Sequence, residues 1–174
     1  MSRHAAWAWV FVLTLILGIG LAAAPSGAAV AEKKADGFDR LKSLVGEWDG
    51  TSNEGKPVHI SYSLTAAGSA VMESIDPGTE HSMISMYHRD GQKLMMTHYC
   101  AAGNQPRMKA GDLSADGRTL SFTYVDATNL AKAADPHMVK LVLTLPDADH
   151  LTQEWTFRTD GKDSPTVFQL ARKR

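Results

Sequence analysis

Hydrophobic and polar residues alternate along most of the chain after residue 46. Successive side chains of a β-strand point to opposite faces, so this alternation is typical of strands that are buried on one side. In the segment 58–65, for example, one face carries Val58, Ile60, Tyr62 and Leu64. Turn-forming residues interrupt the alternation at intervals of roughly 8–12 residues. The pattern predicts strands over residues 46–50, 58–65, 69–75, 81–88, 94–100, 107–112, 120–124, 137–145, 151–158 and 166–170.

Helical spacing occurs before the first of these strands. Phe38, Leu41 and Leu44 recur at helical intervals, so the segment 36–45 is predicted to be a short helix with one apolar stripe. Gly46 is expected to end this helix, since glycine is favoured just after a helix. Residues 126–136 break the strand alternation and contain several alanines. That segment fits either one or two helical turns or a plain surface loop.

Strands that follow one another without intervening helices predict an all-β, antiparallel protein, either a sandwich or a closed barrel. Short turns such as Asp90-Gly91 join consecutive strands, which favours an up-and-down meander. Closing such a sheet removes its exposed edges. We therefore predict a single up-and-down β-barrel of about ten strands with a short N-terminal helix.

The first 31 residues have the composition of a secretory signal peptide. Arg3 precedes an apolar core, and Ala29-Val30-Ala31 forms a small-x-small cleavage pattern before Glu32. Cleavage there leaves residues 32–174 as one barrel domain that is periplasmic or secreted, with no stable membrane insertion. The rival interpretation is an uncleaved anchor, because the apolar run approaches the roughly 20 residues that span a bilayer.

Composition narrows the possible functions. The whole chain has 18 basic and 19 acidic residues and a formal net charge of −1, and loss of Arg3 with the signal peptide makes that charge −2. The basic surface that nucleic-acid binding requires is therefore not indicated. Cys100 is the only cysteine, so no intramolecular disulfide can form and packing must stabilise the fold.

The most informative segment, residues 93–108, reads KLMMTHYCAAGNQPRM. Its first half alternates like a strand and places Met96, His98 and Cys100 on one face. Its Gly-Asn-Gln-Pro part predicts a turn, after which Arg107 begins the next strand. The segment thus predicts a hairpin that carries an imidazole and the only thiol two residues apart on one face.

Imidazole and thiolate are ligands for zinc and copper, so His98 and Cys100 are a candidate metal pair. Two ligands do not make a site, and a third would have to converge from elsewhere in the fold. A catalytic Cys–His pair is a further alternative, although Cα atoms two residues apart on a strand lie about 7 Å from each other, which makes direct contact awkward. The simpler interpretation is a hydrogen-bonded histidine and a packed cysteine that line the barrel interior.

Glu73 shares its predicted face with Val71 and Ile75. A carboxylate inside a barrel must be paired or hydrogen-bonded. Arg107 is a candidate partner, and an interior Glu–Arg pair would orient the polar head of a ligand. The alternative is that these charged side chains face solvent, as is usual for Glu and Arg. The seven methionines after Met1 suit a soft, apolar pocket, and ordinary core packing explains them as well.

Gly46-x-Trp48 at the end of the predicted helix resembles the entry to lipocalin-like (calycin) barrels, and this resemblance implies that Trp48 closes one end of the barrel. The motif THYCxxGNQPRM, residues 97–108, resembles a family of exported bacterial lipocalin-like proteins of unknown function. This resemblance extends over essentially all of residues 32–174 and implies a barrel without an established activity. Nitrobindin-type haem barrels also begin with G-x-W, but the predicted last strand has no histidine to match their haem ligand.

The sequence favours non-covalent binding of a small, mainly apolar molecule inside the barrel, without a cofactor. The expected lining is Met96, His98 and Cys100, with Glu73 and Arg107 as polar anchors. The alternatives are a metal or haem site that uses His98 and Cys100, an enzyme on the same cavity, and a filled barrel that acts through its surface. The C-x-x-C-H pattern of covalent haem attachment does not occur in the chain.

Overall fold

The computed structural model describes residues 36–76 and 78–174, so the predicted signal peptide, residues 1–31, lies outside the described residues. The elements of the described part are α1 (Gly37–Lys42), β1 (Gly46–Ser52), β2 (Pro57–Thr65), a 3-10 turn (Ala66–Gly68), β3 (Ala70–Ile75), β4 (Met83–Asp90), β5 (Lys93–Tyr99), β6 (Gln105–Ala110), β7 (Thr119–Thr128), β8 (His137–Thr144), β9 (His150–Thr159) and β10 (Lys162–Arg172). Within this part, no helix has the length and apolar character needed to cross a membrane.

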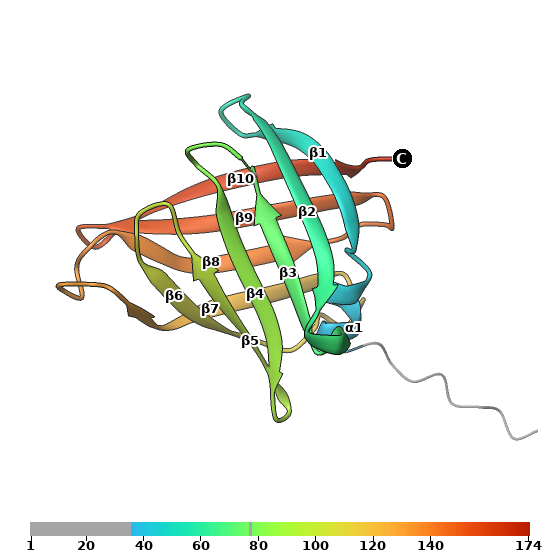
Figure 1. Ribbon diagram of the computed structural model, residues 1–174, viewed down its shortest axis with the longest axis horizontal. Helices are drawn as coiled ribbons and strands as arrows, with labels where there is room; N and C mark the ends of the chain where they lie inside the picture. The colour runs from blue at the N-terminus through green and yellow to red at the C-terminus, as the bar shows by residue number, and fades with distance from the viewer. Residues whose placement is uncertain (1–35, 77) are drawn as a thin grey trace, which may run out of the picture. The chain divides into compact units, whose positions relative to one another are not determined.

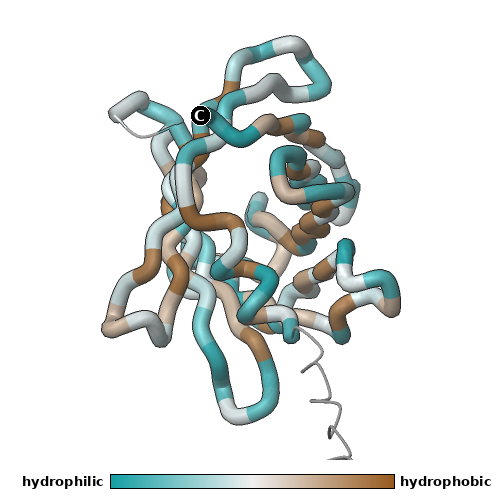
Figure 2. The backbone as a smooth tube through the Cα atoms, turned by 90° about the vertical axis from the view of Figure 1, so that its right-hand side faces the viewer, coloured by the Kyte–Doolittle hydropathy of each residue, from teal (hydrophilic) through white to brown (hydrophobic). Residues whose placement is uncertain are grey.

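The ten strands form one closed antiparallel barrel (Figure 1). Each strand pairs with the next one in sequence, and β1 pairs with both β2 and β10. Figure 2, turned by 90°, shows hydrophobic and hydrophilic residues alternating along the strands that surround the interior. This arrangement confirms the predicted all-β, up-and-down barrel and the short helix that precedes it.

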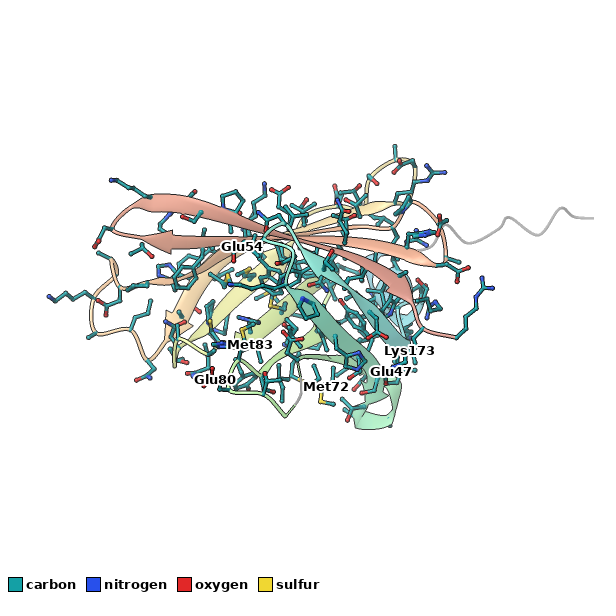
Figure 3. The ribbon with its side chains drawn as sticks, turned by 90° about the horizontal axis from the view of Figure 1, so that it is seen from above. Glu47, Glu54, Met72, Glu80, Met83 and Lys173 are labelled. Atoms are coloured by element: carbon teal, nitrogen blue, oxygen red, sulfur yellow. The ribbon has the colours of Figure 1, made fainter. Side chains whose placement is uncertain are left out.

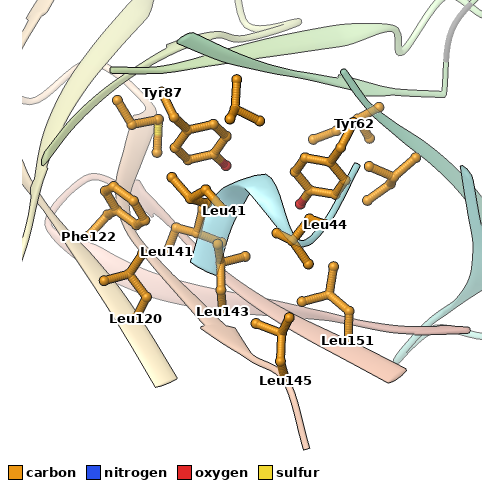
Figure 4. Packing of buried hydrophobic residues seen from close by; sticks show 14 of the residues in the cluster. Leu41, Leu44, Tyr62, Tyr87, Leu120, Phe122, Leu141, Leu143, Leu145 and Leu151 are labelled. Atoms are coloured by element: carbon orange, nitrogen blue, oxygen red, sulfur yellow. The ribbon is translucent and has the colours of Figure 1, made fainter. Parts of the chain in front are cut away.

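The core lies inside the barrel, where the alternating apolar residues of the strands meet (Figure 4). Tyr62, Tyr87 and Phe122 pack there with Leu41 from α1, all of them almost fully buried. Burial of each large apolar side chain stabilises the fold by roughly 1.5–3 kcal/mol. Leu64 is an exception to its predicted face. It is 48% exposed, because it lies at the end of β2 next to the 3-10 turn.

The helix begins at a side-chain cap. The Asp36 carboxylate accepts hydrogen bonds from the backbone N–H groups of Phe38 and the following residue, at 2.9 and 3.0 Å. Phe38 and Leu41 are buried against the barrel core. The helix ends at Lys42, three residues before its predicted end. Gly46 then takes a φ of 127°, which favours glycine, as the chain turns into β1.

Trp48 lies fully buried beside the segment that links α1 to β1. Its indole Nε1 donates to the carbonyl of Leu44 at 2.8 Å. Arg172, near the end of β10, places its guanidinium 4.2 Å from the centre of the indole ring and donates to the carbonyls of Ser43 and Val45, both at 2.8 Å. The last strand thus holds the linking segment in place over Trp48.

The hairpin between β5 and β6 differs from the prediction. β6 begins at Gln105, so Pro106 and Met108 are buried and Arg107 lies on the outer face. The register with β7 shifts between Arg107 and Met108, a local irregularity that the sequence pattern does not reveal. β7 continues past the predicted break, and residues 129–136, which follow it, form a loop without a helix.

The two ends of the barrel differ (Figure 3). Glu47 and Lys173 lie toward the end that carries α1, and Glu54, Glu80 and Met83 lie toward the other. The second end is formed by the connections from β1 to β2, β3 to β4, β5 to β6, β7 to β8 and β9 to β10. The helix does not cover this second end, and we call it the barrel mouth.

Closure of the barrel depends on a close approach of β1 to β10 at Gly50. A Cβ atom on Gly50 would lie 1.9 Å from the carbonyl oxygen of Gln169. Gly50→Ala therefore forces the two backbones apart, and we expect it to lower the free energy of unfolding by about 3 kcal/mol, which urea denaturation measures. Gly111→Ala is the matched control, since its Cβ would meet no atom closer than 3.9 Å. Equal losses in the two variants would contradict this account of closure.

Candidate ligand cavity

A cavity of about 200 Å³ lies in the barrel mouth. Its lining comes from β4, β5, β8, β9 and β10 and is mainly apolar. The lining residues are Met83, His98, Met138, Trp155, Thr166 and Phe168. Hollows on the outer surface are larger, for example about 460 Å³ beside His59 and His81, but they are more open to solvent. Because binding sites enclose most of a small ligand's surface, the cavity in the mouth is the candidate site.

His98, from β5, is fully buried. Its Nδ1 lies 3.0 Å from the hydroxyl oxygen of Ser85, its partner on β4, and its ring packs on Trp155 with 4.6 Å between the ring centres. Its Nε2 is buried and has no hydrogen-bond partner among the described residues. Burial lowers the pKa of His98 to about 4, since a buried imidazolium would lose its hydration. The imidazole is therefore neutral at neutral pH and has one unused nitrogen.

Behind the cavity, the fully buried carboxylate of Glu73 organises a polar network. Tyr62 donates to one of its oxygens at 2.6 Å, Tyr87 donates to the other at 2.8 Å, and the Gln153 amide donates at 2.6 Å. The side-chain oxygen of Gln153 in turn accepts from the Trp155 indole at 2.8 Å. The network therefore fixes the ring against which His98 packs.

The two tyrosines of this network remain protonated. Burial raises the pKa of both phenols, and the negative charge of Glu73 raises it further. Each phenol thus keeps its proton and serves as a donor. The carboxylate, which can only accept, has a donor on each oxygen without any basic side chain.

The predicted ion pair between Glu73 and Arg107 is wrong. The side chain of Arg107 is 52% exposed and pairs with Asp126 on the adjacent strand, with Nε 2.6 Å from one carboxylate oxygen. The reason is the period of two along β6: because Met108 points inward, Arg107 points outward. Arg107 is therefore not an anchor in the barrel interior.

Met96 and Cys100 do not line the cavity. Met96 is fully buried in the core, beside Met108 and Tyr87 on the neighbouring strands. Cys100 follows the end of β5 and is only partly buried in the β5–β6 turn. Burial raises the pKa of its thiol, so the thiol stays protonated at neutral pH and is a weak nucleophile. Of the five predicted ligand-binding residues, His98 is the one at the cavity.

The described residues do not support the predicted alternatives of a metal site and a haem site. They contain no group of three or more His, Cys, Asp or Glu side chains placed to hold a metal ion. A third ligand for His98 and Cys100 is thus not brought near in this part of the chain. A cavity of about 200 Å³ is too small for a tetrapyrrole such as haem.

Five of the six lining residues were not predicted from the sequence. Trp155 and Phe168 belong to predicted strands, and Met83 and Met138 belong to the pool of methionines that suit a pocket. Alternation indicates which of these side chains point inward, but it does not indicate at which level of the barrel interior a cavity remains. That information depends on strand register, which side-chain pattern alone leaves open.

Comparisons with known proteins bear on the fold. No family model and no curated protein matches the chain. A solved structure of a protein of unknown function from the DUF3598 family, from Nostoc punctiforme, is similar, with a TM-score of 0.52 and 16% sequence identity. The match covers 76% of this chain and 48% of that one, so this chain spans about half the length of its structural neighbour. At this identity the likeness shows a shared barrel architecture alone.

The low pKa of His98 makes stability depend on pH. The usual histidine value is 6.5 and the folded value is about 4, so between these the unfolded chain binds more protons and stability falls as the pH decreases. We expect the wild type to lose about 3 kcal/mol more than His98→Phe between pH 7 and pH 4, as measured by urea denaturation. Exposed aspartates lose their stabilising contacts in both proteins, so the difference isolates His98. Parallel pH profiles would disprove the assignment.

Proposed function

We propose that this protein binds a small, mainly apolar molecule in the cavity of the barrel mouth. The observation that carries the proposal is an apolar cavity lined by a histidine whose buried Nε2 has no partner in the described part of the chain. An unpaired buried polar atom costs roughly 1–3 kcal/mol. An occupant that forms a hydrogen bond with Nε2 removes that cost, and any apolar part of an occupant gains contacts with the apolar lining.

The volume of the cavity limits the occupant. A cavity of about 200 Å³ exceeds the roughly 150 Å³ that suffices for benzene in another protein. It is smaller than the roughly 300–1,000 Å³ of sites for drug-sized ligands. The proposed ligand is therefore a single ring or a short chain, and a long fatty acid would not fit.

The chemistry of the lining favours a ring. Trp155 and Phe168 offer aromatic faces, which pack well against another ring. Met83 and Met138 have flexible, polarisable thioethers that adapt to the shape of a ligand. Both methionines are only partly buried and lie against the core, so their side chains have room to move aside as a ligand enters.

Binding is tested with toluene, which is apolar and has a single ring. We expect toluene to shift the amide NMR signals of Met83, His98 and Met138 in the full chain. Met138→Trp fills the cavity with a larger side chain and should raise the Kd for toluene at least about tenfold. Met72→Trp is the matched control, since Met72 alternates with the buried Glu73 and lies on the outer face of β3. Equal affinities in the two variants, or no binding by the wild type, would refute the proposal.

We also propose that the protein is exported to the periplasm or beyond, where it would meet such a molecule. The support is the pattern of Arg3, the apolar run and the small-x-small site before Glu32. Mass spectrometry of the protein from the exported fraction should find a chain that begins at Glu32. Ala31→Lys removes the small residue that cleavage requires, so residues 1–31 should be retained. A wild-type chain that keeps its apolar run and stays with the membrane would support an anchor instead.

A further inference from the structure

We propose that the molecule in the cavity donates a hydrogen bond to Nε2 of His98. The ligand would then be a small, uncharged ring that bears one hydroxyl or N–H group, such as a phenol. This inference rests on the proposed function, since it names the chemical class that the same cavity selects. It follows from the directions of the hydrogen bonds among the buried side chains of β3, β4 and β5.

Glu73, Ser85 and His98 form one row across β3, β4 and β5. Ser85 pairs with Glu73 on one side and with His98 on the other. All three side chains are fully buried. Tyr87, two residues along β4 from Ser85, donates its hydroxyl hydrogen to Glu73 at 2.8 Å. The negative carboxylate at one end of the row favours neighbouring dipoles whose hydrogens point toward it.

The single hydroxyl hydrogen of Ser85 decides the state of His98. The hydroxyl oxygen of Ser85 lies 3.0 Å from Nδ1 of His98, so one of these two groups donates to the other. If Ser85 accepts, the imidazole hydrogen lies on Nδ1 and has an acceptor, and the lone pair of Nε2 is unused.

The opposite arrangement is less favourable. If Ser85 donated to Nδ1, the hydrogen of His98 would sit on Nε2, where it has no acceptor in the described part of the chain. Proteins tolerate an unused lone pair better than an orphaned N–H donor. Nε2 is therefore an acceptor, and a cavity occupant satisfies it by donating.

The charge of the ligand follows from the lining. No Lys, Arg, Asp or Glu side chain lines the cavity, and the second polar lining group is the hydroxyl of Thr166. A charged ligand would lose its hydration without gaining an ion pair. A neutral molecule with one donor loses little, because Nε2 replaces the water that the donor leaves behind.

Three probes of similar size test this inference in the full chain. Phenol carries a donor, benzonitrile carries an acceptor alone, and toluene carries neither. We expect the Kd of toluene divided by that of phenol to fall about five- to tenfold in His98→Phe, the usual effect of one lost hydrogen bond. The ratio of toluene to benzonitrile should stay unchanged. Each ratio cancels any general loss of fit that the substitution causes.

The position of the imidazole hydrogen is tested directly by 15N NMR of the histidine side chains in the free wild-type protein. We expect His98 to carry its hydrogen on Nδ1. Ser85→Ala removes the acceptor of that hydrogen, so the hydrogen should move to Nε2 and the preference should shift from phenol toward benzonitrile. A merely structural role of His98 would not reverse this preference.

The outcomes separate the two proposals. Toluene binding with an unchanged phenol ratio in His98→Phe, or a hydrogen found on Nε2 in the wild type, overturns the donor inference and leaves ligand binding intact. Failure of all three probes to bind overturns the proposed function and the inference together. A phenol preference that disappears in His98→Phe supports both.

Discussion

The barrel closes through the pairing of β1 with β10. Without it, both strands would be open edges and the interior would be exposed along a seam. Gly50 permits the pairing, because a side chain there would collide with the backbone of β10. Closure also brings distant residues together. Tyr62 and Gln153, 91 positions apart in the sequence, touch inside the barrel only because the sheet meets itself.

Closure divides the interior into three levels. Next to α1, leucines and aromatic residues fill the barrel, as Figure 4 shows for Leu41, Leu44 and Phe122. In the middle, Glu73 and its donors form a polar layer that contains no basic side chain. At the mouth, partly buried methionines and aromatic rings leave a cavity. The hypothesis of a filled barrel therefore describes the α1 end, and the proposed ligand binding concerns the mouth.

Much of the fold and part of the site could be predicted from the sequence. The alternation of Val71, Glu73 and Ile75 indicates that Glu73 faces inward, and the same period of two places His98 inside. Arg107 shows the limit of this reasoning. The sequence predicts a strand that begins at Arg107, whereas β6 begins at Gln105, and the inward position belongs to Met108. Period two places Arg107 and Met108 on opposite faces, but it does not indicate which of the two faces is inside.

The class of the fold follows from the sequence alone, because period-two alternation and frequent turn residues are local properties that each segment carries on its own. The same alternation predicts an imidazole and a carboxylate inside the barrel. Which groups meet there depends on the folded arrangement of the strands. Neutral donors surround Glu73, Ser85 occupies one nitrogen of His98, and Trp155 packs against its ring. These contacts join strands that are far apart in sequence, and they depend on register and closure, which are properties of the whole sheet.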